Sequence, residues 1–107
     1  MEQPTERDVE EISREIGKEL YKSDFGARKP TSNEEIQRGR KWLETNRVFI
    51  CGIIRKESVQ RVMRGKDNNV EEQIRLLVDV VGSIVVGVPP NLVAKAIIVL
   101  GEAWFCK

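Results

Sequence analysis

The segment from Val70 to Val86 constrains the fold more than any other, because its charges are spaced for a helix. At about 100° per residue, its branched apolar residues gather on one side. They are Val70, Ile74, Leu77, Val78, Val81, Ile84 and Val85. The polar residues fall on the other side: Glu71, Glu72, Arg75, Asp79 and Ser83. A strand would scatter these charges over both faces, although valine and isoleucine favour strands. The pattern therefore predicts a helix over 70–86.

A second apolar helix is predicted over 90–104, directly after Gly87-Val88-Pro89-Pro90. Proline fits the first turn of a helix because no intrahelical donor is lost there. Its main apolar face includes Leu92, Ala96 and Leu100, and Ile98 and Phe105 fall on nearly the opposite side. Two interpretations follow. Either Ile98 and Phe105 form an exposed anchor for a partner, or this helix is central and buried on both sides.

The N-terminal segment predicts a helix over 6–21. Its apolar residues recur at helical spacing, at Val9, Ile12, Ile16 and Leu20. Thr5 and Asp8 resemble a capping box at its start. Ser13 and Gly17 lie beside the apolar seam, where small side chains would let another helix approach closely. Residues 22–31 are predicted to be a loop, because Gly26 and Pro30 interrupt them.

The basic middle of the chain predicts further helices over 33–44, 46–56 and 58–64. A capping box is expected at Ser32 to Glu35, and Gly65 is expected to end the last of them. One unbroken helix over 33–64 would be about 48 Å long, whereas a globule of this length has a radius of gyration of about 13 Å. The best break is Glu44 to Asn46, where polar side chains can cap, and a second is Glu57-Ser58 with Ser58 as the cap.

Together these segments predict an all-α fold, a single domain over 1–107 forming a compact bundle of about five helices with a hydrophobic C-terminal hairpin. Hydrophobic residues make up 40% of the 107 residues and charged residues 33%, which is typical of globular domains. A membrane-inserting hairpin is the alternative for the C-terminal part. Asp79 and Lys95 disfavour it, because they leave an uncharged run that is shorter than the roughly 20 residues a spanning helix needs.

The absence of histidine excludes many chemistries. The chain has no histidine and two cysteines, Cys51 and Cys106. Without histidine there is no Ser-His-Asp or Cys-His nucleophile, and two cysteines alone cannot complete a zinc site. We expect both cysteines to be reduced thiols in a cytoplasmic protein. We also expect no enzymatic activity, no cofactor, no metal and no small-molecule substrate.

Paired carboxylates are expected to be structural, because they lie early in helices, where negative charge is favourable. The pairs are Glu10-Glu11, Glu34-Glu35 and Glu71-Glu72.

Basic residues concentrate in the middle third. Residues 36–66 contain nine basic and two acidic side chains, a net charge of +7, although the whole chain carries only +1. The candidate interaction residues of this segment are Arg38, Lys41, Arg55, Lys56, Arg61 and Arg64. On a helical wheel they spread over most of the circumference, so a solvated surface is the first interpretation. An acidic protein partner is the second, and nucleic acid or anionic lipid the third.

These features predict a non-enzymatic protein–protein interaction domain, a small helical adaptor or regulatory module that binds a protein partner or itself as a homo-oligomer. The alternative is a membrane-associated helical protein of the toxin, pore-former or immunity type. A nucleic-acid-associated regulator is the third hypothesis.

Overall fold

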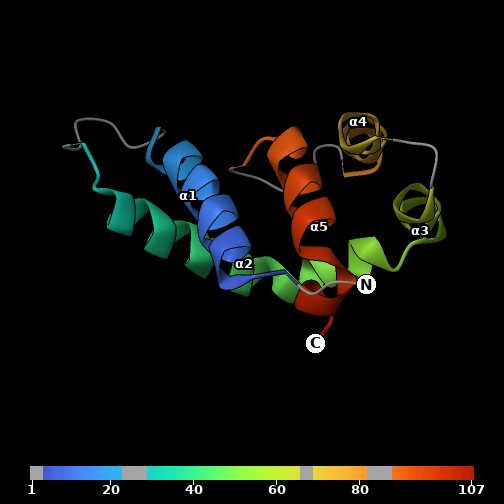
Figure 1. Ribbon diagram of the computed structural model, residues 1–107, viewed down its shortest axis with the longest axis horizontal. Coiled ribbons are helices and arrows are strands. Elements are labelled where there is room, and N and C mark those ends of the chain that lie inside the picture. The colour runs from blue at the N-terminus through green and yellow to red at the C-terminus, as the bar shows by residue number, and fades with distance from the viewer. Residues whose placement is uncertain (1–3, 23–28, 66–68, 82–87) are drawn as a thin grey trace.

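The computed structural model describes residues 4–22, 29–65, 69–81 and 88–107, and every regular element among them is an α-helix (Figure 1). The five helices of these ranges are α1 (Glu6–Lys22), α2 (Ser32–Ile54), α3 (Glu57–Arg64), α4 (Val70–Val81) and α5 (Pro90–Phe105). The predicted all-α bundle is therefore confirmed. Residues 23–28 of the predicted loop lie outside the described residues.

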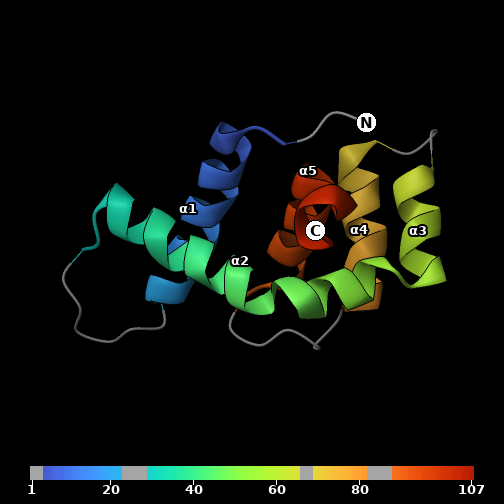
Figure 2. The same ribbon diagram turned by 90° about the horizontal axis from the view of Figure 1, so that it is seen from below.

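Helix α2 is the longest helix, and α1, α5 and α3 pack directly on it. It runs along the long dimension of a molecule that measures 43 × 28 × 24 Å, and α1 and α5 lie side by side across it (Figures 1 and 2). Helix α4 packs on α5, and α3 packs on α4 at the far end of α2. The bundle is thus a row of four helices beside one long helix.

Helices α1 and α2 approach until their backbones touch. A Cβ atom built on Gly17 would lie 1.8 Å from the Glu35 carbonyl oxygen, and one built on Gly39 would lie 1.6 Å from the Ser13 carbonyl oxygen. Only glycine, whose side chain is a single hydrogen atom, therefore fits at both positions. The expectation that Ser13 and Gly17 allow a close helix contact is confirmed.

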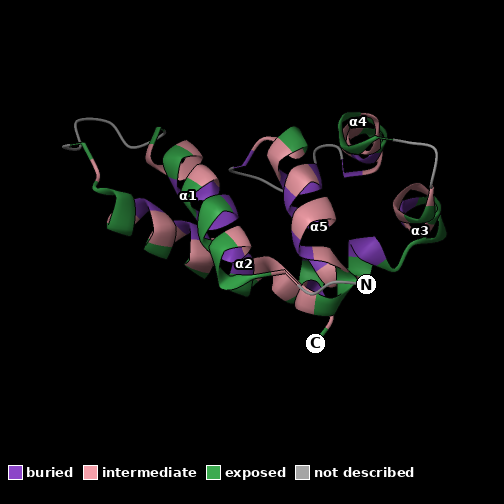
Figure 3. Cartoon of the chain, in the orientation of Figure 1, coloured by how far each residue is buried: buried purple, intermediate pink, exposed green. Residues whose placement is uncertain are grey.

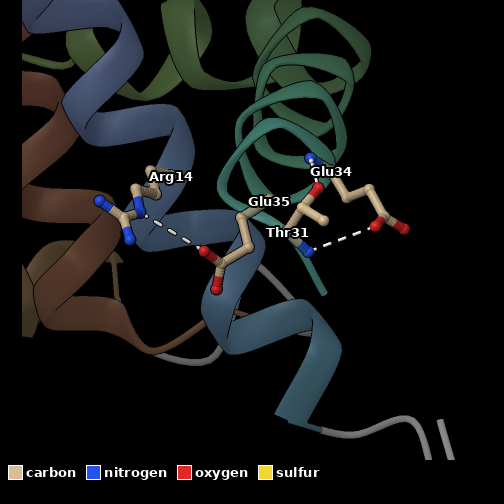
Figure 4. Close-up of polar contacts among 4 residues, drawn as sticks. All are labelled: Arg14, Thr31, Glu34 and Glu35. Atoms are coloured by element: carbon tan, nitrogen blue, oxygen red, sulfur yellow. Dashed lines mark hydrogen bonds and ion pairs between the residues drawn. The ribbon is translucent and has the colours of Figure 1, made fainter. Parts of the chain in front are cut away.

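Two adjacent acidic residues at the start of α2, Glu34 and Glu35, make different contacts (Figure 4). Thr31 accepts a hydrogen bond from the Glu34 amide at 3.2 Å, and the Glu34 carboxylate accepts one from the Thr31 amide at 3.2 Å. The capping box therefore begins one residue before the predicted Ser32. Glu35 is buried at the α1–α2 contact, where Arg14 Nε lies 3.4 Å from Glu35 Oε1. Both carboxylates are structural in this arrangement.

The break predicted at Glu44 to Asn46 is wrong, because α2 continues through it to Ile54. Asn46 does not cap a helix. Its side-chain amide donates to the Trp42 carbonyl at 2.8 Å, so it is satisfied inside the helix. The chain turns instead at Arg55 and Lys56, close to the second predicted break, and α3 begins at Glu57, ahead of Ser58.

Helix α2 ends there because its last carbonyl groups find other donors. The Lys56 amide donates to the Ile53 carbonyl at 3.1 Å, and the Gln60 side chain donates to the Ile54 carbonyl at 2.7 Å. At 23 residues α2 is about 34 Å long, which fits the molecule.

The C-terminal hairpin belongs to the core, as predicted, and shares it with α1, α2 and α3. Helix α5 is almost entirely buried or intermediate between Leu92 and Gly101, whereas the other helices also carry exposed residues along their length (Figure 3). The fully buried apolar residues of α4 and α5 are Leu77, Val81, Val93, Ala94, Ala96, Ile97, Leu100 and Phe105. The part of the predicted 70–86 helix beyond Val81 lies outside the described residues. Within the described ranges, no helix is long and apolar enough to cross a membrane.

Helix α5 has a sharp kink at Gly101, which the sequence pattern did not predict. Gly101 has φ 75° and ψ 173°, a conformation that is essentially restricted to glycine. The kink turns the last residues of the chain toward α2, where Cys106 forms a disulfide with Cys51. The prediction of two reduced thiols is therefore wrong.

Candidate protein-binding face

The side of α2 that faces away from the core carries two large apolar residues. Val48 is 81% exposed and Phe49 is 48% exposed, although both lie within a regular helix between the buried residues Leu43 and Ile50. Gly52 follows Val48 by one helical turn, and a Cβ atom built on it would meet no atom within 4 Å. This part of α2 is therefore uncovered and open to another molecule.

Basic residues lie at both ends of this uncovered stretch. Lys41 precedes it and Arg55 follows it, and both are exposed, as is Lys56 in the turn. At about 100° per residue, Lys41, Val48 and Arg55 lie within about 40° of one another around the helix. We call this surface the α2 outer face and define it as Lys41, Glu44, Thr45, Val48, Phe49, Gly52 and Arg55.

The structure brings together only some of the predicted basic residues. Arg38 is at the N-terminal end of α2, and its guanidinium carbon lies 4.5 Å from the centre of the Tyr21 ring. Arg61 and Arg64 belong to α3, and Arg61 pairs with Glu57 at 2.7 Å. The α2 outer face thus contains Lys41 and Arg55 of the predicted set, with Lys56 next to it.

The predicted anchor pair Ile98 and Phe105 does not exist as one exposed surface. Phe105 is only 2% exposed and packs edge-on against Trp104, with 4.9 Å between the ring centres. On the helical wheel of an unkinked helix, Phe105 lies beside Ile98, but the kink at Gly101 rotates the residues that follow it. Phe105 therefore belongs to the core, and its prediction as an exposed anchor is wrong.

Ile98 is half-buried and lines a cavity of about 330 Å³ between α3, α4 and α5. Arg64, another predicted site residue, lies at the same cavity with Gln60 and Glu102. Gln60 Nε2 lies 3.5 Å from Glu102 Oε2, so the polar groups at this rim already interact with one another. The cavity therefore presents an apolar floor but no unpaired charge cluster directed into it.

Acidic residues of the described ranges form no group that could hold a metal ion. Besides Glu34 and Glu35, Glu72 lies in the first turn of α4, where its backbone amide donates to Asn69 Oδ1 at 2.8 Å and its carboxylate lies 3.4 Å from the Arg75 guanidinium. Glu15 accepts from Lys95 at 3.0 and 3.1 Å and joins α1 to α5. These carboxylates serve helix ends and helix contacts.

Sequence reasoning missed the α2 outer face because it divided α2 in two. With a break at Glu44 to Asn46, Val48 and Phe49 fall in the first turn of a short helix over 46–56, apart from Lys41. A single helical wheel over 32–54 was the signal that could have found it. On that wheel Val48 and Gly52 lie opposite Leu43 and Ile50.

Comparison with family models, curated proteins and solved structures finds no match for this chain. Its function is therefore argued from its own residues.

Proposed function

We propose that this chain is a non-enzymatic protein-binding domain, a small adaptor or regulatory module that uses the α2 outer face. The observation that supports this most directly is the exposure of Val48 and Phe49 next to each other on a well-packed helix. Apolar area removed from water contributes about 25 cal/mol per Å². Aromatic residues are also enriched at protein interfaces.

The remaining surface supports a protein partner less well. The other large exposed apolar residues of the described ranges are Val70 and Leu76 on α4. Val70 is the first residue of its helix, and its neighbour Glu71 is charged and exposed. Val70 therefore provides a matched control for Val48, since both are exposed valines in helices.

A selection experiment tests the proposal. The whole protein is immobilised and used to select binders from a library of about 20-residue helical peptides with varied surface positions. Affinities of the selected peptides are then measured for wild type, for the double variant Val48→Ser with Phe49→Ser, and for Val70→Ser. We expect the double variant to lose at least about tenfold in affinity.

The control variant Val70→Ser should bind the peptides like wild type. All variants should keep the helical circular dichroism spectrum of wild type, and Val70→Ser should keep its melting temperature. The double variant should melt lower, because about half of Phe49 is covered, so affinities are compared at a temperature where every variant is folded. If no selected peptide distinguishes the double variant from wild type, the α2 outer face is not the binding surface and the proposal fails.

The disulfide supports an oxidising compartment for this protein. Cellular thiol buffers keep such cysteine pairs reduced in the cytosol, whereas disulfides persist in secreted and periplasmic proteins. This proposal replaces the cytoplasmic location, which was expected from free thiols. Mass spectrometry after alkylation of the protein taken directly from its native cells tests it, because a bonded pair remains unalkylated.

A further inference from the structure

We propose that the partner of the α2 outer face is an acidic amphipathic helix of a different protein. This inference rests on the proposed protein-binding function and adds the chemistry of the partner. It rests on the shape of the α2 outer face, on its charge, and on the like-charge contacts that two paired α2 helices would make.

The shape of the α2 outer face suits a helix. Val48, Phe49 and Gly52 lie along one side of α2 within little more than one turn. At the α1–α2 contact, Gly17 and Gly39 let two helix backbones touch. Gly52 offers the same close approach on the outer side, with no atom within 4 Å of its Cβ position. An incoming helix can therefore lie against Gly52 and cover Val48 and Phe49.

The charge of the α2 outer face selects an acidic helix. Lys41 and Arg55 are about 21 Å apart along the helix axis at 1.5 Å per residue, with the apolar residues between them. A complementary helix has carboxylates about four turns apart and an apolar patch between them. Glu44 is exposed on the same side, but Lys56 next to Arg55 leaves the surface positive.

A symmetric pairing of two α2 helices from two copies of this chain suits this surface poorly. An antiparallel pairing of two α2 helices centred on Val48 places Lys41 of each copy against Arg55 of the other. A parallel pairing places each cation beside its own equivalent. Both arrangements bring like charges together, which is unfavourable at an interface. Nucleic acid also fits poorly, since Val48 and Phe49 interrupt the row of cations that phosphates would contact.

The test uses a helical peptide library with a constant apolar stripe. At the positions that flank this apolar stripe, the library contains glutamate and lysine in equal amounts. Selection on the whole wild-type protein should enrich glutamate over lysine by about tenfold or more. Selection on the double variant Lys41→Glu with Arg55→Glu should reverse that preference. The control Lys18→Glu makes the same kind of charge change on α1 and should keep the wild-type preference.

A second variant tests the helix contact itself. Gly52→Gln adds a side chain where the structure has open space, so the protein should fold normally. We expect it to weaken binding of the selected acidic peptides by about tenfold, because the helices can no longer approach. Unchanged affinity would contradict a helix lying against Gly52.

Three other results overturn the inference. Peptides that need Val48 and Phe49 but show no glutamate preference would leave the proposed function intact and remove the acidic partner. Tighter binding of a random DNA duplex than of the acidic peptides, lost in Lys41→Glu with Arg55→Glu, would assign the face to nucleic acid. A doubled mass in light scattering that Val48→Ser abolishes would assign it to a second copy.

Discussion

Gly17 of α1 and Glu35 of α2 lie so close that a methyl group on Gly17 would be 1.8 Å from the Glu35 carbonyl oxygen. The neighbouring pair, Ser13 and Gly39, repeats this contact in the opposite direction. The obstacle is backbone at both positions, and a helix backbone cannot move aside like a flexible side chain. The pair of glycines therefore sets the distance between α1 and α2.

The first prediction is that Gly17→Ala destabilises the protein by about 3 kcal/mol or more, since the added methyl group must push the helices apart. Urea denaturation followed by circular dichroism measures this. Gly52→Ala is the matched control. It should be neutral or stabilise the protein by up to about 1 kcal/mol, because alanine favours helix and the site is open. Equal stability of the two variants would contradict the close contact.

The second prediction concerns Ser13 at the same contact. Its hydroxyl oxygen is buried and has no hydrogen-bond partner among the described residues. Removing an unsatisfied buried polar group while keeping Cβ should leave stability unchanged or raise it by about 1 kcal/mol. Ser13→Ala should therefore unfold at the same or a higher urea concentration than wild type. A loss of more than about 1 kcal/mol would mean that the hydroxyl is hydrogen-bonded.

The third prediction is that Gly101→Ala destabilises the protein by about 1–3 kcal/mol. There is open space for a Cβ atom at Gly101, so the cost comes from the backbone conformation alone. A synthetic protein with D-alanine at this position provides the decisive comparison, because D-residues favour positive φ. It should recover the stability of wild type. If L- and D-alanine have the same effect, α5 does not adopt the kink.

The fourth prediction is that reduction of the disulfide destabilises the protein. The bond joins residues 55 positions apart, and a loop of that size contributes about 4 kcal/mol in the chain-entropy model. The double variant Cys51→Ser with Cys106→Ser should unfold at a lower urea concentration than oxidised wild type and should not respond to dithiothreitol. Wild type treated with dithiothreitol should match the variant. Free thiols found by titration of the unfolded, untreated protein would contradict the bond.

Most helix positions could be predicted from local patterns. The start of α1, for example, follows from reciprocal hydrogen bonds between Thr5 and Asp8, and the structure contains both. The turn after α2 was harder. Glu44 to Asn46 and Arg55-Lys56 both consist of polar residues, and the choice between them depends on the Gln60 side chain reaching the Ile54 carbonyl. That hydrogen bond exists only after α3 has folded back.

Residue spacing within single segments was enough to predict that the chain is helical, that α4 and α5 supply much of the core and that α1 carries a small-residue contact, because each of these properties depends on one segment. Which apolar residues stay exposed to water, and that the two thiols meet, depends on how the helices pack together. Phe105 is buried and Phe49 is exposed, although both follow helical spacing. The kink at Gly101 brings Cys106 to Cys51 and turns Phe105 inward, whereas among the described helices none covers the exposed half of Phe49. Periodicity assigns a residue to a side of a helix, but only packing decides whether another helix covers that side.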